Sequence, residues 1–219
     1  MSPKKVIPPA KERILSLYTD YCLMNGKRPA TVYKFAKENG FEEADFYKHF
    51  SSFETLENHY FTEMFSHTVV TLNQSPSYHE YDGVQKLSAF YFTFFEMATA
   101  NRSFISWLLK DNGNGIKNLA RLKGLRKEFL AYASAVLEKP FELKEKRLEK
   151  AQEKGLTEGA WLQFLSVFKF WLDDTSAGFE KTDIFIEKSV KASADLVYNS
   201  PLQSLFDLGK FLWKERFTA

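Results

Sequence analysis

The stretch that decides the fold is TVYKFAKENGFEEADFYKHF, residues 31–50. Its apolar side chains recur at helical spacing and predict one helix over about 29–39 that stops at Gly40. A short helix over about 42–49 follows, and an apolar stripe in residues 10–25 predicts a helix before them. Three short helices with a glycine-bearing turn between the second and third predict a helix-turn-helix.

Helical periodicity continues through the rest of the chain, and no alternating strand pattern is evident. We expect further helices at about 51–73, 83–100, 102–111, 116–137, 141–154, 158–174, 180–198 and 202–217. The sequence therefore predicts an all-α protein of about ten helices. A helix-turn-helix domain over residues 1–55 would precede a larger helical domain over 56–219, which would bind a ligand and form a dimer.

Local signals set some of these boundaries. Ser51 and Glu54 have capping-box spacing and predict the start of the fourth helix. Thr157 is expected to cap a helix that starts at residue 158, and the segment NQSPSYHEYDG, residues 73–83, is expected to be a loop by its composition.

The N-terminal residues resemble a known family. Thr31, Val32, Phe35, Ala36 and Gly40 match the pattern T-hydrophobic-x-x-I-A-x-x-x-G, and FYKHF at residues 46–50 matches its aromatic close. Both patterns are typical of the DNA-binding domain of the TetR family of one-component bacterial repressors. The resemblance covers about 50 residues closely and the remainder only in its helical architecture. It implies a homodimer that binds operator DNA and responds to a small hydrophobic molecule.

Candidate DNA contacts follow from this resemblance. A helix-turn-helix places its third helix in the major groove and the start of its second helix near phosphate. Residues 1–50 carry nine Lys or Arg and six Asp or Glu, so positive charge is concentrated there. The expected contacts are Lys27, Arg28, Thr31, Lys34, Glu42, Tyr47, Lys48 and His49.

Acidic residues in the third helix argue against DNA binding. Glu42, Glu43 and Asp45 lie within four residues, where they repel a duplex that carries one charge per ~1.7 Å. Phe53 also stands where the family commonly has a lysine. Both hypotheses therefore stay open at this point: operator binding, or a retained scaffold that no longer binds DNA.

An aromatic interior is expected in the C-terminal region. KLSAFYFTFFEMA, residues 86–98, is apolar around most of its circumference and so belongs in the middle of a domain. The candidate ligand contacts are Tyr91, Phe94, Phe95, Trp107, Phe164, Phe168 and Trp171. The alternative is a filled aromatic core without a pocket.

A second resemblance lies in WLDDTSAGFEKTDIFIEKSV, residues 171–190. The segment looks like the C-terminal part of the ubiquinone-biosynthesis accessory proteins, a lipid-binding group with a TetR-like fold. The matching residues are Asp173, Asp174, Ser176, Phe179, Thr182, Phe185 and Ile186. This resemblance implies the alternative function, a lipid-binding accessory protein with a vestigial helix-turn-helix.

The final segment, residues 201–217, is amphipathic without a strongly basic face. We expect the last two helices to form a homodimer interface, which we favour over contact with a membrane surface.

Cys22 is the single cysteine, and no signal peptide or apolar run of ~18 residues is evident, so we expect a soluble cytoplasmic protein. His59, Glu63 and His67 share a helix face without a fourth ligand. No metal site, cofactor or catalysis is expected.

Overall fold

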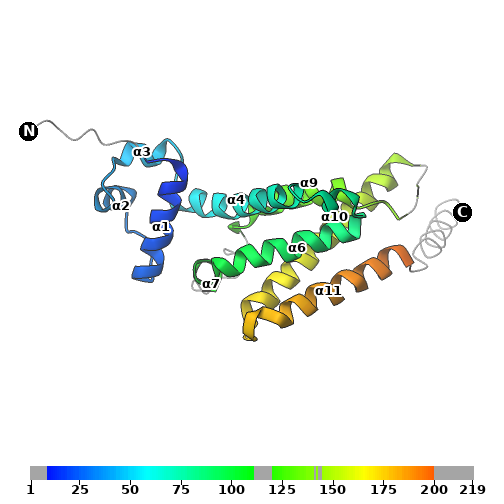
Figure 1. Cartoon of the computed structure of the whole chain (residues 1–219). Helices are drawn as coiled ribbons and strands as arrows, with labels where there is room; N and C mark the ends of the chain where they lie inside the picture. Colours follow the sequence, from blue (N-terminus) through cyan, green and yellow to red (C-terminus); the bar gives the residue numbers. More distant parts are fainter. Residues whose placement is uncertain (1–8, 111–119, 141, 143–144, 200–219) are drawn as a thin grey trace, which may run out of the picture. The chain divides into compact units, whose positions relative to one another are not determined.

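The computed structural model describes residues 9–110, 120–140, 142 and 145–199. Every regular element in these residues is helical, which confirms the predicted all-α fold (Figure 1). The elements are α1 Lys11–Asn25, α2 Val32–Glu38, α3 Glu43–Tyr47, α4 Phe53–Asn73, α5 Pro76–Glu80, α6 Gly83–Ala100, α7 Arg102–Lys110, α9 Lys123–Val136, α10 Lys146–Asp173, the 3-10 turn η1 Ala177–Phe179, α11 Glu180–Ala194 and the π-helical turn η2 Asp195–Asn199. None of the helices in the described part of the chain combines the length and the apolarity needed to cross a bilayer. The helix predicted over 202–217 lies outside the described residues.

The described residues form two compact units. Unit 1 takes its residues from Met1–Val69 and Glu96–Glu128, and unit 2 from Val70–Phe95 and Phe129–Ala219. Helices α4, α6 and α9 therefore contribute residues to both units. The domain boundary expected between residues 55 and 56 stays a prediction. The two units are defined by contacts between residues, and such contacts do not test which segment forms an independent functional domain.

An aromatic cluster holds the first helices of unit 1 together. Phe35 of α2 meets Tyr18 of α1, Phe46 of α3 and Phe53 of α4 edge to face, with ring centroids 6.1, 6.4 and 5.8 Å away. Tyr18, Phe35 and Phe46 have no exposed surface. Edge-to-face aromatic pairs add to the energy of burial, so these rings fix α3 against α2.

The turn between α2 and α3 depends on Gly40. Its backbone has φ of 72°, in the left-handed region that favours glycine. The N–H of Phe41 donates to the carbonyl of Ala36 at 3.0 Å, which satisfies a carbonyl left unpaired at the helix end. The predicted stop at Gly40 is thus confirmed. The helix expected over residues 10–25 is α1, which ends at Asn25 before Gly26, where φ is 62°.

The start of α4 corrects one prediction. Ser52 Oγ accepts a hydrogen bond from the Thr55 N–H at 3.2 Å, and the helix begins at Phe53. The expected capping box of Ser51 and Glu54 is therefore wrong by one residue. The physical reason is Phe53, whose ring stacks on Tyr18 at 5.1 Å and fixes the register of the first turn.

The continuity of α10 corrects a second prediction. The helix runs from Lys146 to Asp173 without a break, although two helices were expected with Thr157 as a cap. The Thr157 hydroxyl lies 3.1 Å from the carbonyl of Glu153 and donates a hydrogen bond inside the helix. Burial of Ala160, Trp161 and Phe164 outweighs the weak helix propensity of this region.

A third correction concerns residues 73–83, where a loop was expected. Pro76–Glu80 form the short helix α5, with Pro76 in its first turn. Proline suits this position because the first N–H groups of a helix lack intrahelical partners.

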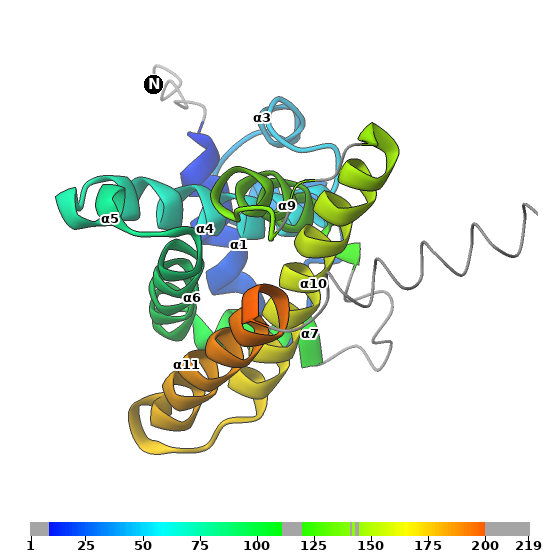
Figure 2. The same cartoon turned by 90° about the vertical axis from the view of Figure 1, so that its right-hand side faces the viewer.

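Helices α10 and α11 of unit 2 lie side by side (Figures 1 and 2). Asp174 joins them, because its Oδ2 accepts hydrogen bonds from the Thr182 N–H at 2.9 Å and the Thr182 hydroxyl at 2.7 Å. Its Oδ1 accepts two more from Ser176. Burial alone would raise the pKa of Asp174, but these donors lower it to about 2. Three residues of the 171–190 motif therefore close the turn between two helices.

Candidate functional site

The residues predicted to contact DNA lie on α2, on α3 and in the adjoining loops of unit 1. Seven of them are exposed, namely Lys27, Thr31, Lys34, Glu42, Tyr47, Lys48 and His49, and Arg28 is half-buried. Thr31 caps α2, since its Oγ1 accepts the Lys34 N–H at 3.1 Å. The hydroxyl proton of Thr31 remains able to donate to a phosphate oxygen.

The acidic residues around α3 are engaged by neighbours. Glu42 lies 3.2 Å from the ammonium of Lys37, and Asp45 lies 2.7 Å from that of Lys48. The hydrogen bond from Lys48 lowers the pKa of Asp45. The Tyr47 hydroxyl donates to Glu43 at 3.4 Å. The exposed face of α2 and α3 therefore pairs lysines with acids, so a phosphate has to compete for those lysines.

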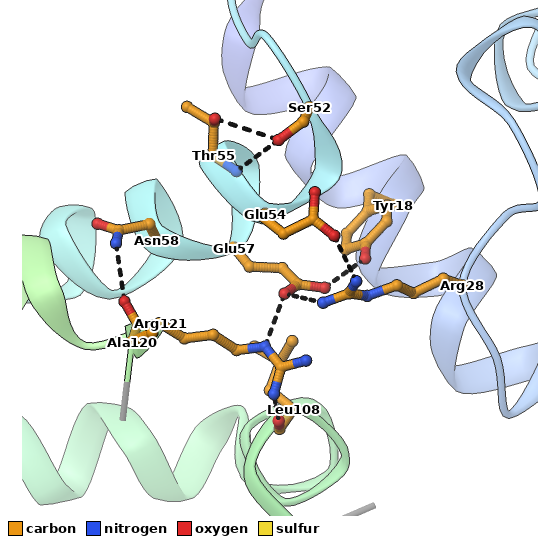
Figure 3. A network of polar contacts seen from close by, with 10 residues as sticks. All are labelled: Tyr18, Arg28, Ser52, Glu54, Thr55, Glu57, Asn58, Leu108, Ala120 and Arg121. Atoms are coloured by element: carbon orange, nitrogen blue, oxygen red, sulfur yellow. Dashed lines mark hydrogen bonds and ion pairs between the residues drawn. The ribbon is translucent and has the colours of Figure 1, made fainter. Parts of the chain in front are cut away.

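Arg28 is engaged by two carboxylates within the protein, and its predicted contact with DNA stays a prediction. Its guanidinium donates to Glu54 at 2.7 Å and to Glu57 at 2.5 Å (Figure 3). Burial would lower the pKa of Arg28, but the charge of Glu57 raises it overall. In the structure, Arg28 ties the loop before α2 to α4.

Glu57 is the centre of this network. Its carboxylate has no exposed surface and also accepts hydrogen bonds from the Tyr18 hydroxyl at 2.6 Å and from Arg121 Nε at 2.8 Å. Arg121 Nη1 in turn donates to the carbonyl of Leu108 in α7 (Figure 3). The donors from three segments converge on one carboxylate and join α1, α4 and α7 within unit 1.

Sequence reasoning missed Glu57 and Arg121. A signal was present, because Glu57 follows buried Leu56 and precedes Tyr60 and Phe61 on a side of α4 that is otherwise apolar. A charged residue in such a position is rarely fully buried unless it is paired. The partner could not be inferred, since Arg121 lies 64 residues away.

No group of three or more His, Cys, Asp or Glu residues in the described part of the chain is placed to hold a metal ion. His59 and Glu63 form a pair at 3.6 Å on α4. Burial is the main cause that lowers the pKa of His59.

The aromatic residues predicted to bind a ligand are closely packed. Six of them are at most 3% exposed in unit 2: Tyr91, Phe94, Phe95, Phe164, Phe168 and Trp171. Phe164 has ring neighbours at 5.1 to 5.9 Å in Phe94, Phe95 and Tyr91. Trp107 belongs to unit 1, where it stacks on Phe104 at 5.9 Å. This packing favours the alternative of a filled core, and ligand contact by these residues stays a prediction.

An apolar groove lies elsewhere in unit 2. It has a volume of about 660 Å³ and is lined by residues from α6, α10, α11 and η2, together with Leu137 and Pro140. None of the seven predicted aromatic residues is among those that line it. Sequence reasoning missed the groove because its lining residues come from separate segments of the chain. Gly155 and Gly159, four residues apart inside one helix, were the available signal.

Comparison with known protein families places the C-terminal part of the chain. Residues 86–212, more than half of the chain, match the family described as "Tetracyclin repressor-like, C-terminal domain". No curated protein matches the chain.

Proposed function

Because this chain belongs to the tetracycline-repressor-like (TetR) family, we propose that it is a one-component transcriptional regulator. It binds operator DNA as a homodimer through α1–α3, and a hydrophobic small molecule in the C-terminal domain changes that affinity. The family match over residues 86–212 is the observation that carries the proposal. A ligand that prefers one conformation shifts the population toward it, which is how occupancy would reach the DNA-binding helices.

The exposed lysines near α2 supply the proposed phosphate contacts. Lys27 and Lys34 are exposed, and the Lys34–Glu38 pair is long at 3.7 Å. Exposed ion pairs contribute only about 0–1 kcal/mol, so Lys34 and Lys37 can exchange a carboxylate for a phosphate. The carboxylates that lose their lysine partners in this exchange still repel DNA. We therefore expect specific binding of modest affinity that falls steeply with salt.

A fluorescence-anisotropy titration tests this proposal. DNA fragments from the region upstream of the gene are titrated at ~50 and ~200 mM salt, and we expect one fragment to be preferred, with a loss of affinity on the order of a hundredfold at the higher salt. Lys27→Ala and Lys34→Ala should each weaken binding and reduce the salt slope by about one. Lys150→Ala, an exposed lysine of unit 2, should change neither and serves as the control.

The second candidate is a lipid-binding accessory protein that does not act at operators. The pairing of Lys37 with Glu42 and of Lys48 with Asp45 favours it, because both lysines are already neutralised. Absence of DNA binding even at ~50 mM salt would refute the regulator proposal. A ligand retained through purification, seen by native mass spectrometry, would then support the second candidate.

We propose that the homodimer forms through the last two helices, of which α11 is described, together with the adjoining surface of α10. Leu162 and Phe170 of α10 and Ile184 of α11 expose 63%, 36% and 49% of their surface. The Phe170 ring stacks on Phe185 of α11 at 4.6 Å, so apolar side chains of the two helices meet near the surface. Apolar faces of this kind mark protein–protein contacts.

A further inference from the structure

The groove in unit 2 contains no charged lining residue among those the structure describes. Its sixteen described lining residues include no Asp, Glu, Lys, Arg or His, although charged residues make up 26% of the chain. Val84 and Leu87 of α6, Leu156 of α10 and Val190 of α11 supply apolar walls. A volume of about 660 Å³ falls within the range of small-molecule sites.

Two glycines open space beside this groove. Gly155 and Gly159 line it from the interior of α10, where glycine is the least favourable residue after proline. A Cβ atom at either position would meet no atom of the described residues within 4 Å, so packing among those residues does not require glycine there. Ala160 and Ala194 add small side chains to the same lining. These residues keep open a volume that larger side chains would fill.

One polar group in the groove has no hydrogen-bond partner in the part of the chain that the structure describes. The Oε1 and Nε2 atoms of Gln152 are buried and have no hydrogen-bond partner among the described residues. The other lining glutamine, Gln163, donates to Ser189 and accepts from the Tyr91 hydroxyl, both at 3.4 Å. The Tyr198 hydroxyl donates to the carbonyl of Glu138 at 2.9 Å. A buried amide without a partner is costly, and a bound molecule could pair with it.

We propose that this groove is the effector site, and that its ligand is an uncharged, mostly apolar molecule with one hydroxyl, amide or carbonyl group that pairs with Gln152. This inference rests on the proposed function, since it names the class of the hydrophobic effector. The groove discriminates against carboxylates, phosphates and ammonium groups. None of the described lining residues could neutralise such a charge, and moving it out of water is costly.

Two fluorescent probes that differ by one charge test the ligand class. N-phenyl-1-naphthylamine is neutral, whereas 1-anilinonaphthalene-8-sulfonate carries a sulfonate on the same aromatic frame. We expect the neutral probe to bind the full chain at least about tenfold more tightly. In competition at ~pH 8, 1-dodecanol should displace it at a concentration about tenfold lower than dodecanoate, which is ionised there.

Variants assign the binding to the groove. Gly159→Leu places a side chain in the open volume and should weaken the neutral probe about tenfold, whereas Lys154→Leu, at an exposed position of the same helix, should not. Gln152→Leu should remove the preference for 1-dodecanol over 1-chlorododecane, which lacks the donor, without weakening the neutral probe. Circular dichroism checks that each variant is folded.

The possible failures are distinguishable. If the charged and neutral probes bind equally well, or if dodecanoate competes as well as 1-dodecanol, the proposed ligand class is overturned while a hydrophobic effector stands. If Gly159→Leu binds like the unaltered protein, the groove is not the site. If neither probe nor either C12 competitor binds, both this inference and the effector part of the proposed function fall, and the DNA titration decides the rest.

Discussion

Glu57 shows how one residue can organise a unit. A carboxylate with no exposed surface is stable only when donors surround it, and Tyr18, Arg28 and Arg121 supply them from three separate segments. Arg28 lies only three residues before Thr31, the cap of α2. The network therefore fixes the loop that sets the position of the proposed phosphate contacts.

Replacing Glu57 should be far more damaging than replacing Glu54, although Arg28 pairs with both. Glu57→Gln removes the buried negative charge that Arg121 and half-buried Arg28 share, so we expect a loss of about 3 kcal/mol in the free energy of unfolding. Glu54 is 66% exposed, and Glu54→Gln should cost less than about 1 kcal/mol. Urea denaturation followed by circular dichroism measures both. Equal losses for the two variants would show that the buried network does not stabilise unit 1.

At the scale of single elements, helix ends and interiors follow different causes. Gly40 and Gly26 end α2 and α1 by adopting positive φ, a local property that the sequence signals. The interior of α10 is decided by packing instead, since its buried aromatic residues carry the helix through Gly155, Thr157 and Gly159. Weak local propensity did not break the helix because tertiary burial outweighs it.

Two glycines should respond to alanine in opposite directions. Gly155 lies inside α10, and no atom of the residues that the structure describes is within 4 Å of an added Cβ. Gly155→Ala should therefore raise the free energy of unfolding by about 0.5–1 kcal/mol. Gly178 has φ of 62°, a backbone conformation that alanine rarely adopts. Gly178→Ala should therefore lower the free energy of unfolding by about 1 kcal/mol. Thermal and urea denaturation give both values. A loss of stability in Gly155→Ala would contradict the open space beside α10.

At the scale of the whole molecule, the proposed regulator requires two copies of the chain. The net charge of +2 opposes the association of two copies only weakly, so burial of apolar surface can drive it. The exposed apolar side chains of α10 and α11 provide that surface. A dimer interface at this surface would explain why these side chains lie outside the core, although the chain buries many other apolar residues.

A single charged substitution on the exposed apolar surface of α10 and α11 tests the proposed dimer. Leu162→Glu places a carboxylate in the proposed interface and should convert the dimer to a monomer at micromolar concentration, as measured by size-exclusion chromatography with light scattering. Met24→Glu changes a side chain that is 87% exposed on α1 and should leave the mass unchanged. A Leu162→Glu protein that remains dimeric would place the interface elsewhere.

The sequence by itself determined the helical class, the three short N-terminal helices and the turn at Gly40. Each of these depends on local periodicity or on the conformational freedom of one glycine, and both can be read from neighbouring residues. The aromatic interior was also foreseeable, because a helix that is apolar on most sides belongs inside a domain.

Only the tertiary structure decided which charges meet and where space remains. Glu57 and Arg121 are 64 residues apart, and the pairing of the α3 acids with lysines depends on side-chain geometry. The groove is formed by residues from distant segments, and its position follows from how small side chains of α10 and α11 fail to fill the space between helices. Pairings and voids of this kind belong to no single segment, because they arise only when separate helices pack.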